Sequence, residues 1–444
     1  MGRCLVKKIG IVLFLVIIMA LVGCEKKKDG INEDKNDDNK ITSSIITDTT
    51  GSKAEDTSNE KESTETMTRK VPIQIKIWHD KEEQVAAVLQ KELDKLAPDI
   101  VVVLEKKEGL TDSLKLVGND SKSAPDMYFF AHDKIGVYAE MGILAPITDF
   151  ISKDVLESFV DVTVSAVTYK ESVYQLPIYF ETLLFMYNKE FMSKEDVPTT
   201  TEELYRYITE NNTGERYGFV EQHSTAYYSV PWIHGFGGKL LSDDGSPGLD
   251  APETIEALKY HKKFVDYMPG ESDYNTVNIL FMNGMADSII GGPWLVPSVR
   301  AKNIDLGFAK MPVVESTGLP LAPYSGVQGV HVLKVAADTK KDAITEILTQ
   351  LINPDIGIAM ANASGCAPAN ELCYVDDSVK QDEMVMMMKQ TAESAIPMPN
   401  IPEMDVMWSV TDNLLVTTNM KNGDPEKEAK KAQKNAVNLI EKMR

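Results

Sequence analysis

The sequence predicts an α/β protein with two lobes, each built on a mainly parallel sheet flanked by helices. The chain has 444 residues, of which 43% are hydrophobic and 25% are charged. It can therefore bury a large core and is too long for one ordinary domain. Its apolar residues also switch repeatedly between the alternation of a strand and the spacing of a helix. A strand, a helix and a strand in succession favour parallel pairing.

The first βαβ unit is the clearest. Apolar and polar residues alternate over 71–77, apolar residues recur at helical intervals over 82–96, and 100–104 is an apolar strand. Asp80 and Lys81 follow the first of these strands. Because ligands of open α/β sheets bind outside the carboxyl ends of strands, this pair is a candidate for binding.

Later segments repeat the alternation of strands and helices. We expect strands at 183–187, 286–290 and 327–333, helices at 254–267 and 342–351, and a mostly helical end over 381–442. The chain should cross back to the first lobe after Pro312.

The beginning of the chain reads as an export signal. Arg3, Lys7 and Lys8 precede an apolar run over 9–22, which is too short for an ordinary membrane span. The run ends at Cys24 in a pattern that resembles a bacterial lipobox, so we expect a signal peptide over 1–23 and a lipid on Cys24. The alternative is an uncleaved anchor. Both place the protein on the outer face of the cell membrane, and we expect a Gram-positive cell.

Residues 24–70 should form a tether, because they are rich in Lys, Asp, Glu, Ser and Thr and poor in bulky apolar residues. The formal net charge of -21 argues against nucleic acid as a partner. Of the four cysteines, Cys366 and Cys373 remain in the mature fold. They could form a disulfide or stay as two buried thiols, and their spacing gives no zinc or redox motif.

Five segments in order resemble the maltodextrin-binding proteins, which are extracytoplasmic solute receptors of bacterial ABC importers. The segments are IWHDK (77–81), PDMYFFAHDKIGVYAEMGIL (125–144), YQLPIYFETLLFMYNKE (174–190), IIGGPW (289–294) and MPNIPEMDVMW (398–408). The resemblance covers 71–444 and implies the two-lobed type II periplasmic-binding-protein fold with crossing hinge segments. It places the N-terminal lobe at 71–180 plus 312–375 and the C-terminal lobe at 181–311 plus 376–444.

Carried over position by position, the resemblance implies a set of ligand contacts. They are Asp80, Lys81, Phe130, Asp133, Lys134, Glu181, Tyr227, Tyr228, Trp294, Met398 and Trp408. A glucose ring has an apolar face that suits aromatic side chains and a rim of hydroxyls that suits carboxylates. Three departures from the family could alter chain-length or anomer preference: Lys134 replaces an arginine, Thr225-Ala226 replaces Glu-Pro, and Ser409 replaces a tyrosine.

Several of these residues also have a purely structural interpretation. We expect Trp78 and Trp232 to be core residues and Tyr138 to be packing, whereas Trp294 follows Gly-Gly-Pro and should lie at a loop mouth. Met398 could pack or touch ligand. Asp133 could pair with a cation, and Glu181 could cap a helix.

The sequence therefore predicts a receptor that captures maltose or maltodextrins between its lobes and delivers them to permease subunits. We expect a monomer with no cofactor, no metal and no enzymatic activity. The alternatives are a receptor for another oligosaccharide, a sugar-sensing lipoprotein and, less favoured, a glycoside-active enzyme, since paired carboxylates in a sugar cleft also serve glycosidases. The sequence contains no nucleophile elbow, HExxH or phosphate-binding glycine loop.

Overall fold

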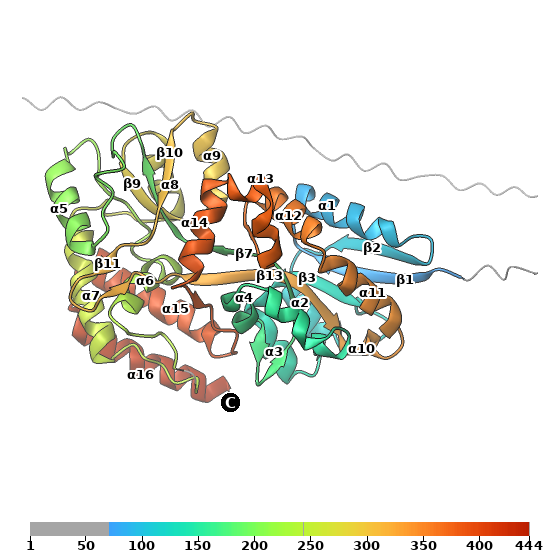
Figure 1. Ribbon diagram of the computed structural model, residues 1–444. Helices are drawn as coiled ribbons and strands as arrows, with labels where there is room; N and C mark the ends of the chain where they lie inside the picture. Colours follow the sequence, from blue (N-terminus) through green and yellow to red (C-terminus); the bar gives the residue numbers. More distant parts are fainter. Residues whose placement is uncertain (1–70, 243, 444) are drawn as a thin grey trace, which may run out of the picture. The chain divides into compact units, whose positions relative to one another are not determined.

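The computed structural model describes residues 71–242 and 244–443. Thr68–Arg444 form one compact unit, which Figure 1 shows as two groups of helices and strands joined in the middle. The predicted signal peptide, Cys24 and the tether lie outside the described residues.

The first lobe surrounds an eight-stranded sheet. Its main path has the order β14-β7-β13-β3-β1-β2, and β4 and β15 also pair with β13. The strands are β1 (Ile73–His79), β2 (Ile100–Lys106), β3 (Met127–Ala131), β4 (Leu144–Ala145), β7 (Leu176–Thr182), β13 (Tyr324–Leu333), β14 (Ala367–Pro368) and β15 (Ile396–Pro397). The predicted βαβ unit is confirmed, because β1 pairs in parallel with β2 and with β3.

Helices cover this sheet, and their apolar faces enter its core. The helices are α1 (Glu83–Leu93), α2 (Leu110–Val117), α3 (Ile135–Glu140), α4 (Asp161–Ala166), α10 (Lys334–Ala337), α11 (Lys341–Leu351), α12 (Pro354–Ser364) and α13 (Asp377–Lys380). In α1, for example, Val85, Leu89 and Leu93 are buried at the helical spacing of four residues. A small hairpin, β5 (Thr168–Tyr169) and β6 (Ser172–Val173), lies beside α3.

The second lobe surrounds a three-stranded sheet of order β10-β8-β9. β8 (Leu184–Asn188) is antiparallel to both β9 (Ser288–Gly291) and β10 (Leu306–Ala309). The two-lobed α/β fold is confirmed, but the expectation of a mainly parallel sheet in each lobe is wrong for this sheet. The first sheet is mixed, since β13 runs antiparallel to β3 and β7.

The burial of β8 explains why its direction could not be read from the sequence. Leu184 and Met186 enter one hydrophobic cluster, whereas Phe185 and Tyr187 enter another on the opposite face. A strand buried on both faces gives a continuous apolar run, which is also the signature of a parallel strand.

The helices of the second lobe carry the rest of its core. They are α5 (Thr201–Asn211), α6 (Ala226–Gly235), α7 (Pro252–Val265), α8 (Tyr274–Met282), α9 (Val296–Arg300), α15 (Met404–Leu415) and α16 (Pro425–Met443). A hairpin of β11 (Val313–Val314) and β12 (Leu319–Pro320) packs on α6. The four helices α6, α7, α15 and α16 share one buried cluster that includes Met407 and Leu414.

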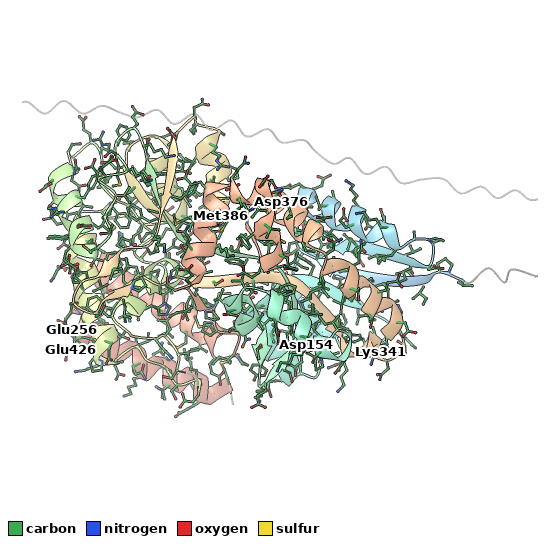
Figure 2. All side chains as sticks on the ribbon, in the orientation of Figure 1. Asp154, Glu256, Lys341, Asp376, Met386 and Glu426 are labelled. Atoms are coloured by element: carbon green, nitrogen blue, oxygen red, sulfur yellow. The ribbon has the colours of Figure 1, made fainter. Side chains whose placement is uncertain are left out.

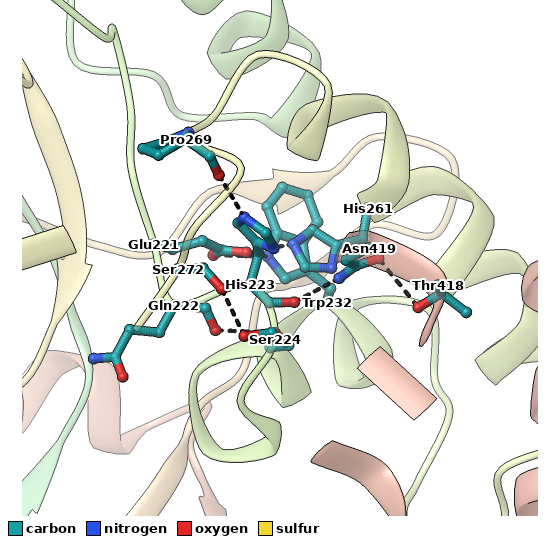
Figure 3. A network of polar contacts seen from close by, with 11 residues as sticks. Glu221, Gln222, His223, Ser224, Trp232, His261, Pro269, Ser272, Thr418 and Asn419 are labelled. Carbon is teal, nitrogen blue, oxygen red and sulfur yellow. Dashed lines mark hydrogen bonds and ion pairs between the residues drawn. The ribbon is translucent and has the colours of Figure 1, made fainter. Parts of the chain in front are cut away.

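A buried polar network ties α6 to α7 in this lobe (Figure 3). The carboxylate of Glu221 is fully buried and accepts hydrogen bonds from Trp232 Nε1 at 3.0 and 3.1 Å, while His261 Nε2 pairs with it as well. The rings of Trp232 and His261 are stacked, with centroids 4.7 Å apart. The network satisfies a carboxylate that would otherwise be costly to bury.

Three segments connect the lobes. Leu183 alone separates β7 from β8, a second segment runs from β10 to β13, and a third follows α14 (Glu383–Ala392) and leads to α15. α14 packs against β7 and β14 of the first sheet and against β8 and β10 of the second (Figure 1). Within 71–242 and 244–443, no helix combines the length and apolar character that crossing a bilayer requires.

Candidate ligand-binding site

Asp80 and Lys81 follow the carboxyl end of β1, where the sequence predicted a site. Lys81 Nζ lies 2.7 Å from Asp80 Oδ1 and donates a hydrogen bond to Gln328 Oε1 at 2.8 Å. The same ammonium lies 5.5 Å from the centroid of the Phe130 ring. Gln328 lies on β13 at a bulge, where the register shifts before Gly329. This end of the sheet therefore holds a fixed positive group between an acid, an amide and an aromatic ring.

Glu181 lies next to this group on β7. Cys366 Sγ is 3.7 Å from Glu181 Oε2 and acts as a weak donor to it. Burial raises the pKa of the Glu181 carboxyl, although the Lys81 charge and Gln328 act in the opposite direction. Burial also raises the pKa of the Cys366 thiol well above its ordinary value, so this thiol is neutral.

These residues line a hollow of about 240 Å³. Its lining consists of Asp80, Lys81, Glu82, Gln84, Val85, Tyr179, Glu181, Gln328, Ser364 and Cys366. Larger hollows lie elsewhere, including one of about 630 Å³ beside Thr391, but none of them contains a predicted site residue. The polar groups on the wall of a pocket, rather than its volume, determine what it binds, which makes this hollow the candidate site.

A second Asp-Lys pair follows β3, the neighbour of β1 in the sheet. Lys134 Nζ lies 3.4 Å from Asp133 Oδ2 and also pairs with Asp405 Oδ1 at the start of α15. Burial lowers the pKa of the Lys134 ammonium, but the hydrogen bond to Asp405 and the charges of Asp133 and Asp405 outweigh it and raise the pKa above its ordinary value. Lys81 and Lys134 thus follow neighbouring strands, and the ammonium group of each is held by carboxylates.

Aromatic side chains of the second lobe gather around Tyr227 on α6. The Tyr227 ring centroid lies 6.2 Å from that of Trp294 and 6.3 Å from that of Trp408. Tyr324, at the start of β13, meets Trp408 edge to face at 5.9 Å. These separations are within the range of favourable aromatic contacts.

Trp294 is the most exposed ring of this cluster, with 38% of its surface accessible. It follows Gly292, where a Cβ atom would come within 2.2 Å of the indole. Only glycine lets the ring lie back over the chain at this point. The predicted position at a loop mouth is therefore found in the structure.

The aromatic cluster adjoins the first lobe. Burial raises the pKa of the Tyr227 hydroxyl well above the ordinary value, and the Glu181 charge on β7 is the next cause. Tyr324, which contacts Trp408, starts β13 two residues before Gly326, the residue paired with Glu181 on β7, so the aromatic cluster and Glu181 lie at the same end of these strands.

Met398 lies beside the same region and is fixed through its backbone. Its N–H donates to Ser325 O at 3.2 Å, and its carbonyl oxygen lies 2.9 Å from His132 Nε2. His132 Nδ1 accepts from the Val327 N–H at 3.1 Å. Because Nδ1 accepts, Nε2 carries the proton and donates to Met398.

The structure separates the predicted residues into partly exposed and fully buried positions. Tyr228 is buried in the core of the second lobe, so its ring supports Tyr227 from behind. Trp78, Trp232 and Tyr138 are buried, and their predicted packing roles are confirmed. Glu181 lies within a strand and caps no helix.

Four residues of this region were not among the predicted ligand contacts: Gln328, Cys366, Tyr324 and Asp405. Gln328 could have been noticed, because it is a polar residue inside the apolar run of β13. Asp405 stands inside the MPNIPEMDVMW segment but at no carried-over position. No local pattern marked Cys366 or Tyr324 as a site residue, because their places in the site depend on how strands distant in the sequence pack together. Among the described residues, no group of three or more His, Cys, Asp and Glu side chains is arranged to hold a metal ion.

Comparison with known proteins agrees with this architecture. Residues 89–387 match the family model of bacterial extracellular solute-binding proteins. The chain belongs to this family. A maltotriose-binding protein of Pyrococcus abyssi is 33% identical over 371 residues, which cover 80% of either chain.

Other members of the solute-binding family are similar over comparable lengths. A galactooligosaccharide-binding protein of Bacillus subtilis is 26% identical and covers 86% of this chain and 92% of its own length. Among solved structures, a cyclo/maltodextrin-binding protein complexed with maltotetraose has a TM-score of 0.76 at 26% identity, covering 84% of this chain and 98% of its own. The solute-binding fold is thus established over the described part of the chain.

Proposed function

We propose that this solute-binding protein is a receptor for maltodextrins, that is, oligosaccharides of α-1,4-linked glucose. The observation that carries the proposal is the cluster of Tyr227, Trp294 and Trp408 rings, which Tyr324 joins to the end of β13 that pairs with Glu181. Rings stack on the apolar faces of glucose units, and carboxylates and lysines hydrogen-bond the hydroxyl rim. The maltotriose-binding relative supports this choice of sugar.

In this proposal each ligand contact has a defined role. Trp294, Trp408, Tyr227 and Phe130 supply stacking surfaces, with Tyr228 and Met398 behind them. Asp80, Asp133 and Glu181 accept hydrogen bonds, and Lys81 and Lys134 donate them. Lys134 gives a single-point contact where an arginine would give a forked one.

The wider biology follows from the same proposal. The two lobes close on the sugar, and the closed form delivers it to ABC permease subunits. A lipid on Cys24 and the tether hold the monomeric receptor at the outer face of a Gram-positive membrane. The protein binds the sugar without cleaving it, in keeping with a family described as bacterial extracellular solute-binding proteins.

A galactooligosaccharide is the second candidate ligand, because one relative of similar coverage is named for that sugar. The galacto epimer differs from glucose in one hydroxyl orientation, so the same stacking surfaces could accept it. The polar groups around Lys81 and Lys134 would then decide between the two. A sensory role would use the same site and a different partner.

Isothermal titration with maltotriose tests the proposal, with lactose and cellotriose as controls and analysis of the recovered sugar. We expect selective binding with a dissociation constant of about 1 μM, which corresponds to roughly -8 kcal/mol, and we expect the recovered maltotriose to be intact. Selective binding of lactose would favour the galacto candidate. Shortened products would contradict a pure binding role.

A further inference from the structure

Lys134 contacts both lobes at once. It lies at the start of α3 in the first lobe, between Asp133 on its own segment and Asp405 on α15 in the second. α15 belongs to the second lobe because it packs on α6 and α16. The Lys134–Asp405 pair therefore joins elements of different lobes at a residue that the proposed function assigns to ligand binding.

The lysine of the pair is more buried than one in an ordinary surface ion pair. The side chains of Lys134 and Asp133 are only 20% and 21% exposed, whereas Asp405 is 42% exposed and approaches Lys134 from the solvent side. The segment that leads to Asp405 is anchored at Asn400, because Gly136 N donates to Asn400 O at 2.9 Å and the Asn400 side chain donates to Ala166 O and Thr168 O. The chain thus reaches Asp405 from an anchor on the first lobe, which limits where its carboxylate can lie.

A lysine has a long flexible side chain, and holding its ammonium in one place costs rotamer entropy. A carboxylate that already restrains the ammonium lowers this cost when ligand binds. Asp133 cannot do so alone, because it is expected to accept hydrogen bonds from the ligand. Asp405 is well placed for this task since it approaches Lys134 from the other lobe.

We propose that Asp405 is a positioning residue of the binding site, which holds the Lys134 ammonium at the junction of the lobes so that Lys134 and Asp133 meet the sugar together. This inference rests on the proposed maltodextrin function and adds to it a residue that the family resemblance did not indicate. Asp405 acts through Lys134 and makes no ligand contact of its own.

A double-mutant cycle on maltotriose affinity tests the inference with the purified protein. We expect Asp405→Asn to weaken binding by about fivefold, the size of one moderate charge pair, and Asp405→Glu to restore most of the affinity. In a Lys134→Met background, Asp405→Asn should add less than about twofold, because the group it positions is gone. If Asp405 had only a structural role, each of its substitutions would lower the melting temperature, and its effect on affinity would not depend on Lys134.

Glu426 provides a matched control. It pairs with Lys259 and so joins α16 to α7. Its side chain is 46% exposed, against 42% for Asp405. Figure 2 shows it beside Glu256, the other partner of Lys259. Glu426→Gln should leave the affinity unchanged. Additive effects of the Asp405 and Lys134 substitutions, or no effect of Asp405→Asn on an unaltered protein that binds maltotriose, would overturn the inference alone. Failure of the unaltered protein to bind maltotriose would overturn the proposed function, and the inference with it.

Discussion

The imidazole of His132 donates a hydrogen bond from Nε2 to the carbonyl oxygen of Met398, 2.9 Å away. These residues are far apart in sequence, and the bond holds the third crossing segment against the end of β3. The other ring nitrogen accepts from Val327 on β13. One buried side chain therefore fixes two strands and a crossing segment beside the candidate site.

Replacing His132 by alanine should destabilise the protein, because two buried backbone groups lose their partner and a cavity remains. We expect the free energy of unfolding to fall by about 2 to 4 kcal/mol, measured by denaturant titration. Maltotriose affinity should fall as well, because Met398 is released. A loss below about 1 kcal/mol would mean that water or the backbone replaces these bonds.

The tryptophans should divide into two classes. Trp294→Ala should weaken maltotriose binding at least about tenfold with little change in stability, because the ring is partly exposed. Trp408→Ala should weaken binding similarly and cost some stability, since its ring also packs on Tyr324.

Trp232→Ala is the control for this series. Its ring is 1% exposed and its indole N–H bonds Glu221, so its loss should lower the free energy of unfolding by about 3 to 5 kcal/mol. For each variant, maltotriose affinity is measured by calorimetry and stability is measured by thermal melting. If Trp232→Ala melted normally and Trp294→Ala unfolded, the site would have been placed in the wrong region.

Glu181→Gln should stabilise the ligand-free protein at neutral pH. Burial raises the pKa of Glu181 above its ordinary value of 4.5. The stability that the protonated carboxyl contributes is therefore fully present below pH 4.5 and is lost as pH rises toward the raised pKa. The glutamine variant has no such loss, so its melting temperature relative to the unaltered protein should increase from pH 4 to pH 7.

The same variant should bind maltotriose more weakly, because an amide accepts weaker hydrogen bonds than a carboxylate does. Stability and affinity should thus move in opposite directions. If the difference in melting temperature between the variant and the unaltered protein stayed constant across this pH range, Glu181 would ionise as freely in the folded chain as in the unfolded one.

The thiols of Cys366 and Cys373 should be unreactive in the folded protein. Both are free and buried, which decides between the two alternatives that the sequence left open. Burial raises the pKa of the Cys373 thiol to about 12, and thiolates are the reactive species. A colorimetric thiol assay on residues 68–444 should therefore detect almost no reaction in buffer and two thiols in guanidinium. Finding none after unfolding would indicate a disulfide.

Much of the first lobe was predictable because its signals are local. The alternation over 71–77 and the helical spacing over 82–96 correspond to β1 and α1, which end within a few residues of the expected positions. The positions of Asp80 and Asp133 at strand ends were predictable for the same reason. Strand direction in the second sheet was not, because burial on both faces gives the same apolar run in either direction.

The sequence by itself determined the residue types available to the site and the two-lobed α/β plan, since periodicity and composition are properties of short segments. Only the tertiary structure decided which groups meet. Gln328 reaches Lys81 because β13 lies between β7 and β3 with a bulge at that residue, and Asp405 reaches Lys134 because the segment that leads to it is anchored to the first lobe at Asn400. Such contacts depend on the registry and packing of distant elements, which no single segment encodes.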